Sequence, residues 1–191
     1  MKKACMLGIV SLAAIHLAAE VIVTPADWKI GRDAKDPVVT EASFSATANG
    51  PDTILTLKSF QPFPAAENDL LTFSMRFPKG KKTTLQFFWM NDRDRKLSEA
   101  KSLRRTIVGT GELETCVIPL AGRTGWEGTI TGLRLDPAAL PKGTEAEFSI
   151  GEFKLTGLAG GLADPGGLLV PRQQLCEPPA RGRYGHRRLY R

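Results

Sequence analysis

Apolar and polar side chains alternate with a period of two along most of the chain after Glu20. The clearest example covers residues 69–77, where Leu71, Phe73 and Met75 lie on one side of an extended backbone and their polar neighbours on the other. Successive side chains of a β-strand point to opposite faces of its sheet. This alternation therefore predicts a strand with one buried face.

Eight stretches of the chain carry strand patterning of this kind, and residues that favour turns separate them, as in Asn49-Gly50-Pro51-Asp52. The only candidate for a helical turn lies within residues 94–105. Short strands without a long amphipathic helix predict an all-β, antiparallel β-sandwich. About eight or nine strands favour a jelly roll over a seven-stranded immunoglobulin sandwich, with closely related sandwiches still open. The predicted strands cover residues 38–48, 53–60, 69–77, 83–90, 103–108, 112–120, 129–136 and 146–156.

The start of the chain has the composition of an export signal. Two lysines precede an apolar run over residues 4–17, and small residues stand just before Glu20. These features predict a signal peptide over residues 1–19 and hence an exported protein, periplasmic, extracellular or at the cell surface. The apolar run is shorter than the ~20 residues of a membrane-spanning helix. An uncleaved N-terminal anchor is the alternative; after processing, no stable membrane span is expected.

The end of the chain loses the alternating pattern. Residues 158–191 are rich in glycine and proline and finish in arginines. Such a segment can bury little apolar surface, so we expect a disordered basic tail. The predicted sandwich domain is then residues 20–157.

The net charge of +6 belongs to the ends of the chain. Of the 26 basic residues, two precede residue 20 and six follow residue 157, and two of the 20 acids also follow residue 157. The predicted domain therefore holds 18 bases and 18 acids. A neutral domain gives no reason to expect nucleic acid as a partner.

Two cysteines, Cys116 and Cys176, follow the predicted signal peptide. An exported location permits a disulfide between them. Cys116 lies in a predicted strand and Cys176 in the predicted tail, so a buried Cys116 without a bridge is an equal alternative. The sequence leaves the pairing open.

Catalytic residues are scarce in the predicted domain. His186, in the tail, is the only histidine after the predicted signal peptide. The predicted domain therefore lacks the histidine base of a Ser-His-Asp or Cys-His site. It also lacks the residues for a His/Cys metal cluster. A pair of carboxylates of the glycosidase type is what remains, from Asp92, Asp94 and Glu127. We expect no enzymatic activity, because acids at strand ends are common.

The segment Trp126-Glu-Gly-Thr-Ile-Thr-Gly-Leu-Arg-Leu-Asp-Pro137 and the later Phe148-Ser-Ile-Gly-Glu-Phe-Lys-Leu155 resemble the last two strands of galactose-binding-like jelly rolls, including carbohydrate-binding modules of bacterial extracellular proteins. The final strand departs from the family pattern, since Gly151 follows Ile150 where an acid is usual. From the residues themselves, Leu133 and Leu135 should face the core with Arg134 outward, and Gly151 should permit a β-bulge.

The resemblance implies a non-catalytic binding module, with a polysaccharide or glycan as its partner. The alternative is a structural or protein-interaction domain of the cell surface with the same fold and no sugar site. No cofactor is expected, although the resemblance allows a structural calcium whose ligands the sequence does not identify.

Sugar binding would use exposed aromatic rings and nearby polar groups. Each aromatic candidate has a core alternative. Trp89 shares its side of the strand with Leu85 and Phe87, which favours burial, whereas Phe88 points the other way and either faces outward or packs on the second sheet. Trp126 precedes its strand and is expected to close the end of the sandwich. The candidate ligand-binding residues are Trp28, Phe88, Trp89, Asn91, Asp92 and Trp126, with Arg93 as a further polar partner.

Overall fold

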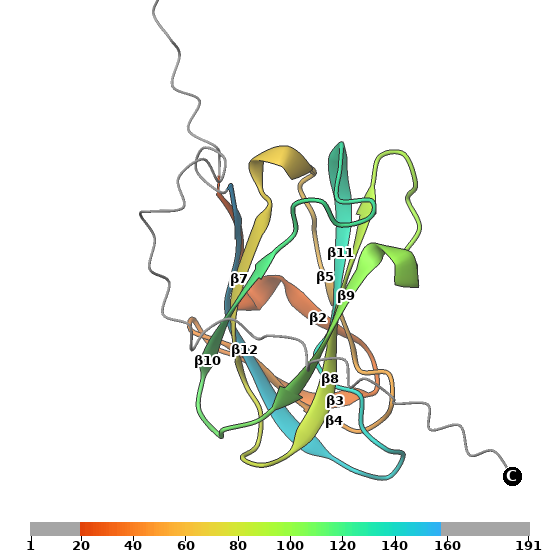
Figure 1. The fold of residues 1–191 in the computed structure, drawn as a ribbon. Helices are drawn as coiled ribbons and strands as arrows, with labels where there is room; N and C mark the ends of the chain where they lie inside the picture. The colour runs from red at the N-terminus through yellow and green to blue at the C-terminus, as the bar shows by residue number, and fades with distance from the viewer. Residues whose placement is uncertain (1–19, 158–191) are drawn as a thin grey trace, which may run out of the picture.

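Two antiparallel β-sheets stack face to face in the computed structural model, which describes residues 20–157 (Figure 1). The all-β sandwich predicted from the sequence is confirmed. The predicted signal peptide (residues 1–19) and basic tail (residues 158–191) lie outside the described residues. The 3-10 helices of the described part are single turns, η1 (Pro25–Asp27), η2 (Ala65–Glu67) and η3 (Glu99–Lys101).

Each sheet contains six strands. Sheet A has the order β10 (Glu114–Pro119), β7 (Leu70–Arg76), β12 (Ala146–Thr156), β4 (Phe44–Ala48) and β3 (Ala34–Val39), and β1 (Val21–Val23) pairs with β12. Sheet B has the order β2 (Trp28–Arg32), β5 (Ile54–Leu57), β11 (Thr129–Asp136), β8 (Lys82–Asn91) and β9 (Ser102–Val108), and β6 (Phe63–Pro64) pairs with β11.

The described residues thus form twelve strands, more than the eight or nine predicted. Every predicted stretch overlaps one of β4, β5 and β7–β12. The strands that were missed carry weak patterns: β1 and β6 have three and two residues, and β2 contains Gly31. β3, which contains Pro37, was predicted only at its last two residues, Val38 and Val39. Asp33, between β2 and β3, has a positive φ of 48°, so the chain turns sharply there.

The predicted strand over residues 38–48 is wrong in its length. Thr40 and Ser43 form a turn that divides it into β3 and β4. The Ser43 N–H donates to Thr40 Oγ1 at 3.0 Å, and the Thr40 N–H donates to the Ser43 carbonyl oxygen at 2.9 Å. A threonine side chain that bonds the backbone in this way competes with strand pairing.

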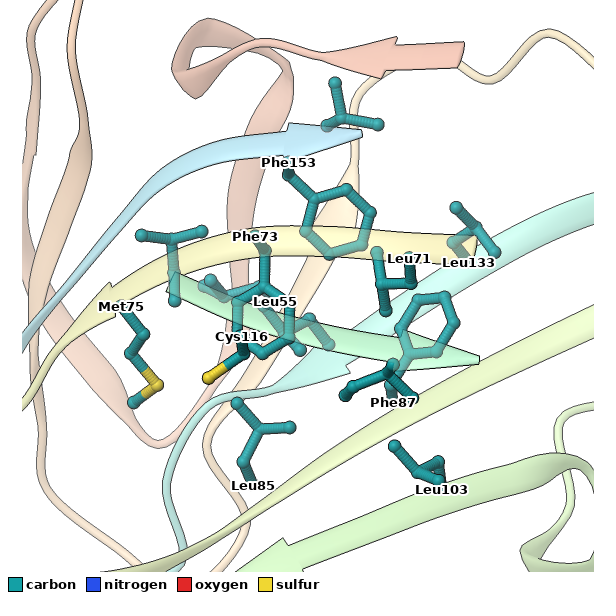
Figure 2. Close-up of a cluster of buried hydrophobic side chains, with 14 of the residues drawn as sticks. Leu55, Leu71, Phe73, Met75, Leu85, Phe87, Leu103, Cys116, Leu133 and Phe153 are labelled. Atoms are coloured by element: carbon teal, nitrogen blue, oxygen red, sulfur yellow. The ribbon is translucent and has the colours of Figure 1, made fainter. Parts of the chain in front are cut away.

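Phe153 of β12 lies at the centre of the core between the sheets (Figure 2). Its ring centroid is 5.3 Å from that of Trp28, 5.8 Å from that of Phe87 and 6.0 Å from that of Phe73. Trp28 and Phe87 belong to sheet B and Phe73 to sheet A. The Phe153 ring therefore joins the two sheets.

The predictions for the last two strands of the sequence are confirmed. Leu133 and Leu135 are buried in the core, and Arg134 lies on the opposite side of β11. The β-bulge expected at Gly151 is present as a shift of register between β12 and β7. The bulge lets both halves of β12 turn apolar side chains inward.

Cys116 is buried on β10 and faces the core (Figure 2). Cys176 lies outside the described residues, so the choice between a disulfide and a buried Cys116 without a bridge stays open. The helical turn expected within residues 94–105 is the single turn η3, after which the chain enters β9.

We expect Phe153→Ala to lower the free energy of unfolding by about 3–5 kcal/mol, because it opens a cavity between the sheets. Leu113→Ala is the control, since this side chain is 53% exposed, and it should change stability by less than about 0.5 kcal/mol. Chemical denaturation of both variants measures the difference. Equal stabilities would contradict the assignment of Phe153 to the centre of the core.

Candidate functional site

A hollow of about 560 Å³ opens on the outer face of sheet B. Sites for small ligands commonly have about 300–1,000 Å³. The hollow exists because β8 directs Leu85, Phe87 and Trp89 into the core and its alternate residues outward. Strand residues form its floor: Thr84, Gln86 and Phe88 of β8, Arg104 of β9, and Arg134 and Asp136 of β11. Residues outside the strands form its walls: Leu97, Ser98 and Glu99 before β9, Pro51 and Asp52 before β5, and Ala138 and Ala139 after β11.

Phe88 is the aromatic residue of this lining. It faces outward, which was one of the two predicted alternatives for this side chain. Its ring is nevertheless 5% exposed. Arg134, its partner across the strands, places the guanidinium carbon 4.8 Å from the ring centroid. This cation–π contact covers the ring, so the ring face is not open to a ligand.

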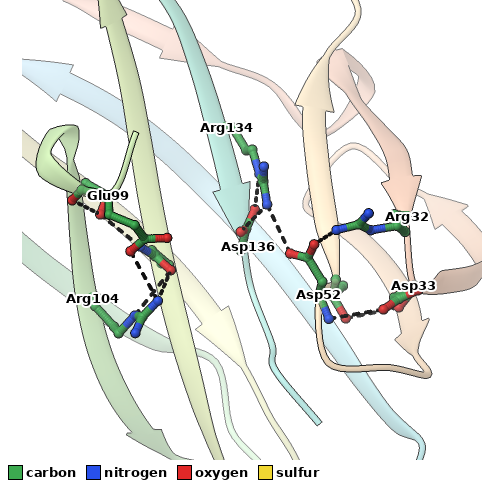
Figure 3. A network of polar contacts seen from close by, with 10 residues as sticks. Arg32, Asp33, Asp52, Glu99, Arg104, Arg134 and Asp136 are labelled. Atoms are coloured by element: carbon green, nitrogen blue, oxygen red, sulfur yellow. Dashed lines mark hydrogen bonds and ion pairs between the residues drawn. The ribbon is translucent and has the colours of Figure 1, made fainter. Parts of the chain in front are cut away.

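Arg134 is held by two carboxylates (Figure 3). Its Nε donates to Asp136 Oδ1 and its Nη2 to Asp136 Oδ2, both at 2.6 Å. Nη2 also donates to Asp52 Oδ1 at 3.1 Å, and Asp52 forms a further ion pair with Arg32. Two-point contacts between arginine and carboxylate fix the guanidinium in one orientation.

Burial raises the pKa of the Asp136 carboxyl above its ordinary value, since Asp136 is only 7% exposed. The hydrogen bonds and the positive charge of Arg134 act in the opposite direction and do not cancel the effect of burial. Asp136 and its hydrogen-bond partner Arg134 thus form the largely buried centre of the floor of the hollow.

A second polar cluster lies on the other side of the floor. Gln86 Nε2 donates to Glu99 Oε2 and to Ser102 Oγ, both at 2.8 Å. Gln86 Oε1 accepts from Arg104 Nη2 at 2.9 Å and from Arg104 Nε at 3.2 Å. Figure 3 shows Glu99 and Arg104 on one side of Arg134 and Asp136, as the strand order requires. The amide of Gln86 therefore connects β8 to the segment that leads into β9.

The three tryptophans proposed as binding residues lie in the core. Trp28 and Trp89 are 1% exposed and Trp126 is 6% exposed. Trp126 packs edge-on against Trp89, with ring centroids 5.5 Å apart, as expected for a side chain that closes the sandwich. A stacking role would need an accessible ring face, which these three residues do not offer.

The polar residues proposed beside them also lie away from the hollow. Asn91 Nδ2 donates to the Gly125 carbonyl oxygen at 3.0 Å, and Asp92 Oδ1 accepts the Thr129 N–H at 3.3 Å. Both contacts fix loops at the end of the sandwich. Arg93 is exposed and does not line the hollow either. Of the predicted residues, Phe88 is the one in the hollow.

The segment between β8 and β9 is anchored by Lys101, which is 5% exposed. Its Nζ donates to the Asp94 carbonyl oxygen at 2.7 Å and pairs with Asp94 Oδ2 at 2.9 Å. The hydrogen bond from Lys101 lowers the pKa of the Asp94 carboxyl. The anchor holds Leu97, 37% exposed, at the rim of the hollow.

The polar floor of the hollow has a signal in the sequence that does not depend on aromatic residues. Arg134 and Asp136 alternate on one face of β11, and Gln86 takes the equivalent outward position on β8. Polar residues at outward positions of neighbouring strands meet across the sheet. The register that brings them together is not visible in the sequence.

Within residues 20–157, no three His, Cys, Asp or Glu side chains converge to hold a metal ion. The structural calcium allowed by the family resemblance stays a prediction. In the same range, no helix is long and apolar enough to cross a bilayer.

The pKa shift of Asp136 predicts a dependence of stability on pH. A carboxyl whose pKa is raised by folding contributes stability that is fully present below the unfolded value, near 3.8, and is lost as pH rises through the folded value. The free energy of unfolding of the wild type, minus that of Asp136→Asn, should therefore fall as pH rises from acid to neutral. Chemical denaturation of both proteins at several pH values between acid and neutral measures this difference in stability.

Asp94→Asn is the control with the opposite sign. The pKa of Asp94 is lowered in the folded protein, so its contribution is present above 3.8 and lost as pH falls. If the stability difference between wild type and Asp136→Asn instead rose with pH, as expected for Asp94→Asn, burial would not be the main influence on the pKa of Asp136.

No protein-family model and no curated protein matches the sequence. Solved structures do resemble the fold. An agarase, AgWH50C, matches 75% of this chain and 24% of its own, with 11% identity and a TM-score of 0.50. A low-affinity xylan-binding module, CBM86, from Roseburia intestinalis matches 72% of this chain and 94% of its own, with 13% identity and a TM-score of 0.49.

The family 11 carbohydrate-binding module from Clostridium thermocellum, solved with a β-1,3-1,4-mixed-linked tetrasaccharide, matches 72% of this chain and 95% of its own, with 15% identity and a TM-score of 0.48. At these identities the likeness concerns the fold. The predicted fold class is confirmed by the structure itself, since the described residues form a sandwich of two antiparallel sheets.

Proposed function

We propose that this chain is an exported, non-catalytic module that binds carbohydrate in the hollow on sheet B. The observation that supports this most directly is a set of hydrogen-bonding side chains, held in fixed orientations, in an open hollow on the sheet face. Groups that are already ordered lose little conformational freedom when a ligand binds. Fold likeness to carbohydrate-binding modules supports the same proposal by analogy.

The chemistry of the hollow suits sugar hydroxyls, which both donate and accept hydrogen bonds. Arg104 and Arg134 supply N–H donors at the floor, and the carboxylates of Asp52 and Glu99 supply acceptors. A carboxylate has about four acceptor positions, so oxygens that already accept from arginine can still accept from a hydroxyl. The hollow therefore offers both donors and acceptors to the hydroxyl groups of a sugar.

A catalytic role is less well supported, as the carboxyl groups of Asp136 in the hollow and Asp94 outside it show. A glycosidase acid must deliver its proton to the leaving oxygen. Asp136 has a raised pKa, but Arg134 donates to both of its oxygens. Asp94 has a lowered pKa, which is the opposite of what a general acid requires. We therefore propose a binding role alone.

The second candidate function is a protein-interaction domain of the cell surface. The observation in its favour is that Phe88, the aromatic residue of the hollow, is covered by Arg134. It predicts association with protein, or self-association, and no retention by polysaccharide.

Affinity electrophoresis of the full chain in gels that contain single polysaccharides tests the proposal. The wild type should be retarded by at least one of them, and Arg104→Ala should weaken the retardation about tenfold, since a hydrogen bond from a charged group contributes about 1.5–3 kcal/mol. Arg104 is largely exposed, so the fold should survive the change.

Arg93→Ala is the matched control, because Arg93 is as exposed as Arg104 but lies outside the hollow. It should migrate like the wild type. Retardation of the wild type that Arg104→Ala leaves intact would place the binding site elsewhere, and no retardation in any gel, together with self-association, would favour the interaction domain.

A further inference from the structure

We infer that the ligand of the hollow is an uncharged polysaccharide chain that stands on edge, with its sugar faces against aliphatic side chains of the two walls and its hydroxyl edge on the polar floor. This inference rests on the proposed function and goes beyond it in naming the ligand class, its orientation and Leu97 as a binding residue.

The orientation follows from the absence of an open ring face among the described residues of the hollow. Phe88 is covered by Arg134, and Trp28, Trp89 and Trp126 lie in the core. A sugar that lay flat on the floor would set its C–H-rich face against guanidinium, amide and carboxylate groups. Those groups would lose water without gaining hydrogen bonds, which is unfavourable.

The walls of the hollow offer the apolar contact that the floor lacks. On one side Leu97 stands at the rim, and on the other Pro51 and Ala139 are exposed. Leu97 belongs to the segment before β9, and Pro51 and Ala139 flank β5 and β11, so the walls rise from different sides of the floor. A sugar ring inserted by its edge would place its two C–H-rich faces against these aliphatic side chains.

The position of Leu97 is fixed by the chain around it. Five charged residues precede it (residues 92–96), so it is an isolated apolar side chain in a charged loop. Lys101 binds Asp94 on one side of it, and Gln86 binds Glu99 on the other. A leucine that is 37% exposed and held at both ends gives a ligand a preformed contact.

The charge of the hollow argues for an uncharged chain. The lining has the carboxylates of Asp52, Glu99 and Asp136 against the guanidiniums of Arg104 and Arg134. The ion pair of Asp52 with Arg32 brings the region to neutrality. A uronic acid or a sulfated sugar would approach carboxylates without a net positive charge to attract it.

The test compares full-length wild type, Leu97→Ala and Leu113→Ala by affinity electrophoresis in gels of uncharged polysaccharides (xylan, mixed-linkage β-glucan, agarose) and of acidic ones (polygalacturonate, alginate). Leu113 is the control because it is an exposed leucine outside the hollow. We expect retardation by at least one uncharged polysaccharide and by neither acidic one. Leu97→Ala should weaken it about fivefold, and Leu113→Ala should not.

A second variant, Leu97→Met, keeps the volume of the side chain and should retain most of the affinity. Thermal unfolding of each variant checks that the fold is intact. Preference for an acidic polysaccharide, or equal binding by Leu97→Ala and wild type, would overturn the inference while the proposed function stands. Wild type that binds none of the five would contradict the proposed function and the inference with it.

Discussion

The burial of two apolar sheet faces against each other is the interaction on which the rest of this structure depends. Each face alone would expose a continuous apolar surface to water, and stacking removes both surfaces at once. Phe153 contacts rings of both sheets, so the two layers share one core. Because successive residues of a strand point to opposite sides, the same packing decides which residues remain outside.

The outer face of sheet B shows the consequence. Because Leu85 and Phe87 lie in the core, their neighbours Gln86 and Phe88 point outward. Arg134 and Asp136 of β11 pair with these two residues across the sheet. These side chains satisfy one another by hydrogen bonds and ion pairs. These hydrogen bonds offset the cost of burying polar groups, and they also give the hollow a fixed pattern of donors and acceptors.

Most of the fold was predictable from the sequence, because alternation reports directly on which face of a strand is buried. The central strands, the inward Leu133 and the bulge at Gly151 were all found in this way. The edge strand β3 was not, since Pro37 and a turn at Thr40 leave it too irregular to show a pattern.

The candidate site was predictable only in part. For Phe88 an outward position was one of two predicted alternatives, and the three tryptophans were proposed for the site but lie in the core. Residue type alone does not show exposure, and large aromatic residues serve cores as readily as surfaces. Arg104 and Glu99 were missed because they join the hollow through the pairing of β8 with β9 and the path of the preceding loop, which are long-range features.

The central claim, that ligand binds on the outer face of sheet B, is tested most directly by following backbone amide NMR shifts during titration of the isotope-labelled chain with a soluble uncharged oligosaccharide. The account predicts that the amides that shift cluster around Gln86, Phe88, Leu97 and Arg134. Shifts confined to the outer face of sheet A, around Thr72 and Ser149, would contradict it.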